Sequence, residues 1–277
     1  MLKIGQINPL KVVGEFPFGY QLSHADDDRS IVLTEEVEQP LAVDSEVQAM
    51  VYTGESGQLA ASLATPKILA GEVKVLKAVG VTDFAAFFDW GLPRDLMVPR
   101  QNQAMPVNQG MVYPVYLYFD EPTGRLLGTT KLHPFLSENG IYFKAGQEVE
   151  LIVCGQTDLG YKVVINQTHL GLVFASDAFK KLRIGDETTG YIKQVREDGK
   201  IDVALQQVNA TGRDALQQAI LDDLEAHGGF STLTDKSPPE EIYAHFNVSK
   251  AAYKRALGAL YKQQKIKLDK QKITLVE

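Results

Sequence analysis

The chain has 277 residues, 44% of them hydrophobic, and a formal net charge of −7. This length allows at least two domains, each with a core of its own. No apolar run is long enough for a signal peptide or a membrane-spanning helix, so we expect a cytoplasmic protein. The single cysteine, Cys154, excludes a disulfide framework and a cysteine metal cluster, and we expect it to be a small core residue.

The negative charge is concentrated at the start of the chain. Residues 1–66 carry 3 basic and 10 acidic groups, whereas residues 67–137, 138–212 and 213–277 carry net charges of +1, −2 and +1. A negative surface repels a polyanion. We therefore expect the first unit to be structural or to face a protein partner, and we expect any polyanion site to lie elsewhere.

A hairpin pattern occurs three times along the chain. An apolar run, an acidic turn with glycine and a second run recur around Gly57, Gly124 and Gly199, at separations of 67 and 75 residues. Each repeat contains five β-rich segments; in the third they are EVELIVCGQ, GYKVVIN, HLGLVF, TTGYIKQV and KIDVALQ. Five short antiparallel strands are typical of a small closed barrel of the OB type, which leaves no exposed sheet edge. In the first repeat, HADDDRS is expected to be the turn between strands two and three.

The periodicity changes from 2 to 3.6 in the last part of the chain. A first helix is predicted from the stripe Leu216, Ala219, Ile220 and Leu224, and ends at Gly228 and Gly229. A second opens with Ser237 as N-cap and Pro238 in its first turn. A third follows Ser249 as N-cap and has the core stripe Tyr253, Ala256, Leu257, Leu260 and Tyr261. Together with the hairpin predicted in KIKLDKQKITLV, three helices describe a winged helix.

The predicted fold is therefore multidomain. Three tandem five-stranded OB-type barrels are expected at residues 1–65, 66–137 and 138–208, followed by an α+β winged-helix domain at residues 213–277.

Basic residues are concentrated over the third helix and the wing. Between Lys250 and Lys272 there are eight basic residues and one acid, Asp269. Such a stripe on a winged helix is typical of contact with a nucleic-acid backbone, although a solvated helix or a protein-docking module carries similar charge. The candidate contacts are Lys250, Lys254, Arg255, Lys262, Lys265 and Lys267, with Lys270 and Lys272 completing the stripe.

The second repeat carries a resemblance to a known domain. Its segments GEVKVLKAVGVTDFAAFFDWGLPRDLMVP and YFDEPTGRLLGTT resemble the OB-type RNA-binding domain named after the largest small-subunit ribosomal protein, here called the S-one domain. The third repeat resembles it next best and the first is the most diverged. The resemblance implies a ligand face of strand aromatics with an Asp and a basic residue in the last hairpin. The implied RNA-binding residues are Phe84, Phe87, Arg100, Asp120 and Arg125 in the second repeat and Tyr161, Phe174, Asp198 and Lys200 in the third.

Stacking of bases on these aromatics has a plain alternative, which is that the rings belong to the barrel cores. Strand alternation places only one of Phe87 and Phe88 outside. As a whole, three S-one-like barrels followed by a winged helix resemble the conserved virulence factor B proteins of bacteria. That resemblance implies RNA binding and regulation of gene expression after transcription.

Catalytic signatures are absent from the sequence. There is no G-x-x-x-x-G-K-[ST], H-E-x-x-H or G-x-S-x-G motif. The five histidines lack metal-ligand spacing, and the cluster His24 to Asp28 is interpreted as a solvated turn. We therefore expect neither an enzyme nor a cofactor.

Three functions remain. The first is a non-enzymatic regulator that binds single-stranded RNA through barrel aromatics and the basic winged helix. The second is a winged-helix transcription regulator that binds duplex DNA and uses the barrels as a protein-interaction arm. The third is an adaptor of the ribosome or of a nuclease, for which a protein partner dominates. Dependence of binding on Phe84 or Phe87 separates the first from the second.

Overall fold

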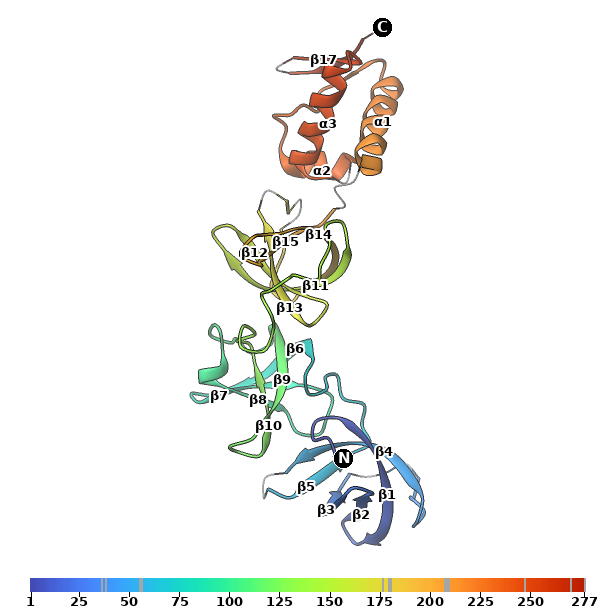
Figure 1. Cartoon of the computed structure of the whole chain (residues 1–277), viewed down its shortest axis with the longest axis vertical. Coiled ribbons are helices and arrows are strands. Elements are labelled where there is room, and N and C mark those ends of the chain that lie inside the picture. Colours follow the sequence, from blue (N-terminus) through green and yellow to red (C-terminus); the bar gives the residue numbers. More distant parts are fainter. Residues whose placement is uncertain are drawn as a thin grey trace. The chain divides into compact units, whose positions relative to one another are not determined.

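The chain folds into two compact units, Met1–Phe135 and Leu136–Glu277. A computed structural model describes residues 1–35, 37, 39–54, 57–175, 177–178, 181–206, 210–246, 248–269 and 271–276, with the side chains of residues 210–214 outside the description. Along the chain, three five-stranded β units are followed by a helical domain (Figure 1). Among the described residues, no helix is long and apolar enough to cross a membrane.

The first β unit is a closed barrel. Its strands are β1 (Ile7–Phe16), β2 (Gly19–His24), β3 (Asp27–Leu33), β4 (Glu46–Thr53) and β5 (Leu59–Ser62), in the order β1-β2-β3-β5-β4. The turn predicted over residues 24–30 is shorter than expected, since β3 already begins at Asp27. The Asp27 carboxylate accepts hydrogen bonds from Arg29 Nε at 2.9 Å and from Nη2 at 2.7 Å, which fixes this strand end.

The second β unit has the same strand sequence but does not close. It contains β6 (Val73–Val81), β7 (Ala85–Asp89), β8 (Leu96–Pro99), the 3-10 helix η1 (Arg100–Asn102), β9 (Val112–Asp120) and β10 (Arg125–Thr129), in the sheet order β10-β9-β6-β7-β8. The closed barrel predicted here is wrong in this respect, because no ladder joins β8 to β10. Strand β8 has four residues and ends in Pro99, which has no N–H to donate. We call the gap between β8 and β10 the open seam.

The third β unit closes as predicted. Its strands are β11 (Glu148–Thr157), β12 (Gly160–Ile165), β13 (His169–Phe174), β14 (Glu187–Val195) and β15 (Ile201–Ala204), in the order β11-β12-β13-β15-β14. The parallel pairing of β13 with β15 completes this barrel, as that of β3 with β5 completes the first.

A β-bulge recurs in the first strand of every β unit. The register against the second strand shifts by one residue just before Gly14, Gly80 and Gly155. A bulge bends the strand and increases its twist, which lets it pair with both the second and the fourth strand. Cys154 is the extra residue in β11, and burial raises the pKa of its thiol to about 11. The thiol is therefore protonated at neutral pH, as suits a packing residue.

The C-terminal domain is a winged helix. Its elements are α1 (Ala210–Ala226), β16 (Phe230–Ser231), α2 (Pro239–Phe246), α3 (Lys250–Lys262), β17 (Ile266–Leu268) and β18 (Ile273–Leu275). The two-stranded wing is extended by β16, which pairs with β18. Helices α1 and α3 pack on a shared core that includes Leu224, Tyr253, Leu257 and Leu260. The predicted fold class of OB-type β units followed by a winged helix is confirmed.

Three details of this domain differ from the sequence prediction. Ser237 is not the cap of α2, which begins at Pro239; the Ser237 hydroxyl instead accepts a hydrogen bond from the Thr234 N–H at 2.9 Å. Ala219 is exposed. Tyr261 is 56% exposed, because the adjacent Leu260 already points into the core. The cap of α3 is as predicted, with Ser249 Oγ accepting from the Ala252 N–H at 3.2 Å.

Replacement of Gly160 is expected to destabilise the third barrel. Gly160 has φ +150°, and a Cβ there would lie 2.1 Å from the carbonyl oxygen of Val173. Because backbone would have to move, we expect Gly160→Ala to lower the free energy of unfolding by about 3 kcal/mol. Urea unfolding followed by circular dichroism measures this. Gly155→Ala is the control, since its Cβ would meet nothing closer than 3.8 Å, and an equal loss in both variants would contradict the prediction.

Candidate nucleic-acid interface

Two of the predicted aromatics lie together on the second β unit. Phe84 immediately precedes β7 and is 65% exposed, while Phe87 is half-buried on the outer face of that strand. Their ring centroids are 6.2 Å apart at an interplanar angle of 86°. Phe88 points inward and is fully buried, so strand alternation separates a core ring from two surface rings.

The surroundings of Phe87 leave its ring accessible. In the sheet register Phe87 lies between Gly80 of β6 and Met97 of β8. Gly80 has no side chain to cover the ring, and a Cβ built there would lie 3.8 Å from Phe87 Cδ2. In the first and third barrels, the residues opposite the equivalent glycines are Gln21 and Lys162. Of the three described β units, the second therefore has the aromatic at this position.

The same register changes the interpretation of Tyr161. Tyr161 precedes Lys162 on β12 and lies at the position that corresponds to Ala86, not to Phe87. Its ring packs partly against the core of the third barrel. It is therefore less available for stacking than the sequence comparison implied.

Arg100, Asp120 and Arg125 lie at the ends of strands in the second unit. The Arg100 N–H donates to the Phe84 carbonyl at 2.8 Å, and its Nη1 donates to the Asp83 carbonyl at 3.3 Å, so this arginine lies beside the exposed aromatic pair. Asp120 Oδ2 accepts hydrogen bonds from the Thr123 hydroxyl at 2.5 Å and from the Thr123 backbone N–H at 3.2 Å. Asp120 thus orders the last hairpin.

A groove of about 420 Å³ runs along the open seam of the second unit. We call it the composite groove, because it is lined by residues of both the second unit and the first barrel. Its lining includes Tyr52 of β4 together with Phe87, Trp90, Arg94, Met97 and Arg125. The groove brings Phe87 and Arg125 together, as the sequence comparison implied, and adds Tyr52 and Trp90, which that comparison missed.

On the third barrel, two cations lie over the ring of Phe174. Lys193 Nζ is 5.7 Å and Arg196 Cζ is 5.4 Å from the ring centroid, within the range of cation–π contacts. Arg196 Nη2 is 2.6 Å from the carboxylate of Asp202, which is 2% exposed. The hydrogen bond that the Arg196 guanidinium donates to the Asp202 carboxylate raises the pKa of this guanidinium. Lys193 and Arg196 were not predicted, because their proximity to Phe174 depends on how β14 crosses β13 and β15.

Lys200 and Asp198 lie in the last hairpin of the third barrel. Lys200 Nζ is 3.8 Å from the Asp198 carboxylate, and both side chains are more than half exposed. Such an exposed pair contributes little to stability.

The predicted cations of the winged helix face different ways. Lys254 and Lys262 are exposed two turns apart on α3, and Lys265 and Lys267 are exposed at the start of the wing. Lys250 is half-buried, and its Nζ donates to the Lys236 carbonyl at 3.3 Å. Lys270 lies outside the described residues.

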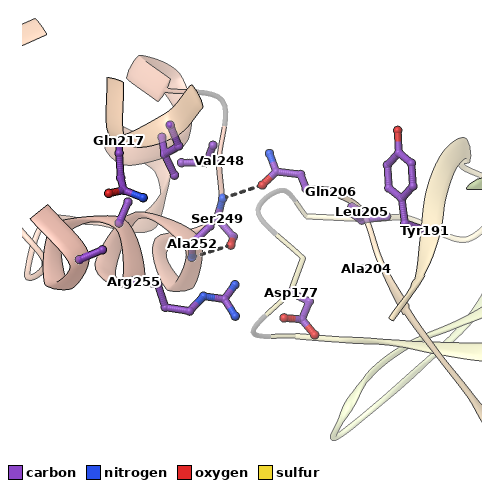
Figure 2. A pocket seen from close by; sticks show the side chains of 13 residues that line it. Asp177, Tyr191, Ala204, Leu205, Gln206, Gln217, Val248, Ser249, Ala252 and Arg255 are labelled. Carbon is purple, nitrogen blue, oxygen red and sulfur yellow. Dashed lines mark hydrogen bonds between the residues drawn. The ribbon is translucent and has the colours of Figure 1, made fainter. Parts of the chain in front are cut away.

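Arg255 is also exposed, but it lines a cavity of about 570 Å³ within the compact unit Leu136–Glu277, together with Asp177 and Tyr191. Figure 2 shows Arg255 extending from α3 on the side of Asp177. Beside it, the Ser249 N–H donates to Gln206 Oε1 at 3.3 Å. Arg255 therefore lies at the cavity between α3 and the third barrel, whereas Lys254 and Lys262 do not line this cavity.

Among the residues that the structure describes, no group of three or more His, Cys, Asp or Glu side chains could hold a metal ion. The aromatic pair, the composite groove and the outward lysines of α3 are the features that carry binding chemistry.

Comparison with known proteins agrees with this architecture. The family model of the CvfB-like winged helix domain matches residues 218–275. The model of the S1 domain, which is the S-one domain, matches residues 4–64, the barrel that the sequence pattern alone ranks as most diverged.

Relatives align over nearly the whole chain. A Bacillus subtilis protein called uncharacterized protein YitL is 27% identical over 96% of this chain and 91% of its own length. Conserved virulence factor B of Staphylococcus epidermidis is 26% identical over 99% of this chain and 95% of its own. A solved multidomain protein with nucleic acid binding domains from Streptococcus pneumoniae is 24% identical, covers 99% of this chain and 98% of its own, and has a TM-score of 0.44. With a CvfB-like winged helix domain at its end and an S1 domain at its start, the chain is similar over nearly its whole length to the conserved virulence factor B proteins.

Proposed function

We propose that this protein is a non-enzymatic bacterial regulator of gene expression that binds single-stranded RNA. Its S1 and winged-helix domains indicate nucleic-acid binding. The observation that carries the choice of a single strand is the aromatic pair of Phe84 and Phe87 on the outer face of β7. The relatives named conserved virulence factor B favour a role in virulence-linked expression, which we expect to take place in the cytoplasm.

Stacking on this pair requires unpaired bases. In a duplex the faces of the bases are covered by their neighbours, whereas a single strand can turn its bases onto aromatic side chains. Stacking accepts any base, because every base has a π-face. Arg100 beside Phe84 supplies a cation at the edge of this surface.

Two further surfaces suit other parts of the RNA strand. The outward lysines of α3 and the wing, Lys254, Lys262, Lys265 and Lys267, suit phosphates, and contacts of this kind add affinity with little sequence information. On the third barrel, Phe174 lies under Lys193 and Arg196, a combination of ring and cations that suits a nucleotide. Tyr161 and Lys200 are proposed as minor contacts beside it.

The same lysines favour a second candidate, a transcription regulator that places α3 in the major groove of duplex DNA and uses the barrels to contact a protein. This candidate assigns no role to Phe84 or Phe87. Substitution of the barrel aromatics therefore separates the two functions.

Loss of the Phe87 ring is expected to weaken RNA binding. Because one stacked base is lost, Phe87→Ala should reduce affinity by about 1 to 3 kcal/mol. Fluorescence anisotropy of a labelled single-stranded RNA measures this, with the same sequence as single- and double-stranded DNA beside it. Tyr142→Ala is the control, because it removes a ring that is 88% exposed and lies outside the second β unit. Tight binding of duplex DNA that is indifferent to Phe87→Ala would favour the transcription regulator.

Neutralisation of the α3 lysines is expected to change the salt dependence of binding. If Lys254 and Lys262 each contact a phosphate, Lys254→Gln with Lys262→Gln should lower the slope of log affinity against log salt by about 1.4 for a single strand. Anisotropy titrations at several salt concentrations give the slope. Lys3→Gln with Lys144→Gln removes the same charge from exposed sites in the barrels. A slope that stays the same in the α3 variant would exclude phosphate contacts by this helix.

A further inference from the structure

We propose that the acidic first barrel completes the RNA site of the second, with Tyr52 forming one wall of a pocket for a single nucleotide. The inference rests on the proposed function and extends it to the composite groove. The ligand would be one unstacked nucleotide of a longer RNA strand. From charge alone, the first barrel was expected to contribute nothing to RNA binding.

The groove lies where no hydrogen-bonded ladder closes the second sheet. In the first and third barrels, a parallel ladder joins the third strand to the fifth, but no ladder joins β8 to β10. The two strands still pack against each other, since a Cβ built at Gly128 of β10 would lie 2.7 Å from Val98 Cγ2 of β8 and 3.2 Å from Leu96 Cδ2. The groove is therefore a surface hollow beside packed strands, and Met97 of β8 and Arg125 of β10 line it.

The walls of the groove are aromatic. Phe87 and Trp90 belong to the second unit, and Tyr52 at the end of β4 belongs to the first barrel. The volume of about 420 Å³ lies in the range of small-ligand pockets. Trp90 is 5% exposed, and its indole N–H donates to the Arg94 carbonyl, so this wall is held in place.

Contacts between the two β units fix the position of Tyr52. Gly5 of the first barrel fits so closely that a Cβ would lie 2.6 Å from Ala70 Cβ and 2.8 Å from Leu126 Cδ2. The Ala70 N–H donates to the Gly5 carbonyl at 2.8 Å, and the Gly5 N–H donates to the carbonyl of Val51, the residue before Tyr52, at 2.7 Å. A pocket that is already formed before binding loses less entropy when it takes up a ligand.

The electrostatics of the groove differ from those of the first barrel as a whole. Arg94 and Arg125 line it together with Asp95, so the groove carries charged groups of both signs and is not uniformly acidic. Burial raises the pKa of the Tyr52 hydroxyl, with Glu35 adding to the effect and Arg94 opposing it. The hydroxyl therefore stays protonated at neutral pH and adds no negative charge to the groove. The acidic surface away from the groove still suits a protein partner.

The chain contains a built-in reporter for this site. Trp90 is its only tryptophan and lines the groove, so its emission reports on the groove alone, whereas anisotropy of a labelled RNA reports binding anywhere. The experiment titrates the full chain with a single-stranded RNA of about 16 nucleotides, the upper site size of one OB domain. Both signals are recorded for the wild type and for Tyr52→Ala, Tyr52→Leu and Tyr52→Phe. Phe18→Ala is the matched control, since Phe18 is an 81% exposed ring of the first barrel outside the groove lining.

If the proposal is right, RNA changes the Trp90 emission of the wild type. Tyr52→Ala and Tyr52→Leu should then bind about 5- to 150-fold more weakly, the equivalent of one lost stacking contact, while Tyr52→Phe and Phe18→Ala bind as the wild type does. Tyr52→Leu keeps the apolar bulk, so it remains informative if Tyr52→Ala unfolds.

Two results would overturn the inference and leave RNA binding intact. One is normal anisotropy binding with unchanged Trp90 emission and wild-type affinity in Tyr52→Leu. The other is an equal loss in Phe18→Ala and Tyr52→Leu, which would show that no groove contact is involved. Absence of any anisotropy change in the wild type would instead overturn the proposed function itself.

Discussion

One extra residue in the first strand of each β unit sets the register between the first and second strands. The bulges before Gly14, Gly80 and Gly155 shift the pairing with the second strand by one position. Because side chains alternate, a shift of one residue exchanges the buried and exposed sets. In the second unit this register turns Phe88 into the core and Phe87 outward, opposite a glycine that leaves the ring uncovered. The bulge thus places Gly80, and not a larger residue, opposite Phe87.

Local patterns were sufficient to predict most of the fold. Alternating apolar residues and turn glycines indicated the strands, and the stripe from Tyr253 to Leu260 indicated α3. Features that depend on the pairing of strands far apart in the chain could not be predicted from local patterns. The open seam reflects the absence of a ladder between β8 and β10. The two-residue period of apolar residues within a strand does not show which strands will pair. The register of Tyr161 was missed for a related reason, since a bulge seven residues or more upstream determines it.

The distribution of charge along the sequence predicted the position of the basic side chains less well than the structure shows it. Lys254 and Arg255 are adjacent in sequence and both are exposed, yet only Arg255 of the two lines the cavity with Asp177. A count of basic residues treats them alike, although a helix rotates by about a quarter of a turn between neighbours. The sequence did not indicate Arg196, because its position depends on two contacts. One is with the ring of Phe174, which is far away in sequence, and the other is with the buried Asp202 on β15.

The two kinds of contact proposed for this protein should respond differently to conditions. Phosphate contacts by the α3 lysines would weaken as salt rises, because their affinity would come from the release of counterions. Stacking on Phe87 and in the composite groove would bury apolar surface and depend little on ionic strength. A chain with a net charge of −7 gains from this division. Its rings can hold bases where electrostatic attraction is weak, and its cations need to be dense only at the winged helix.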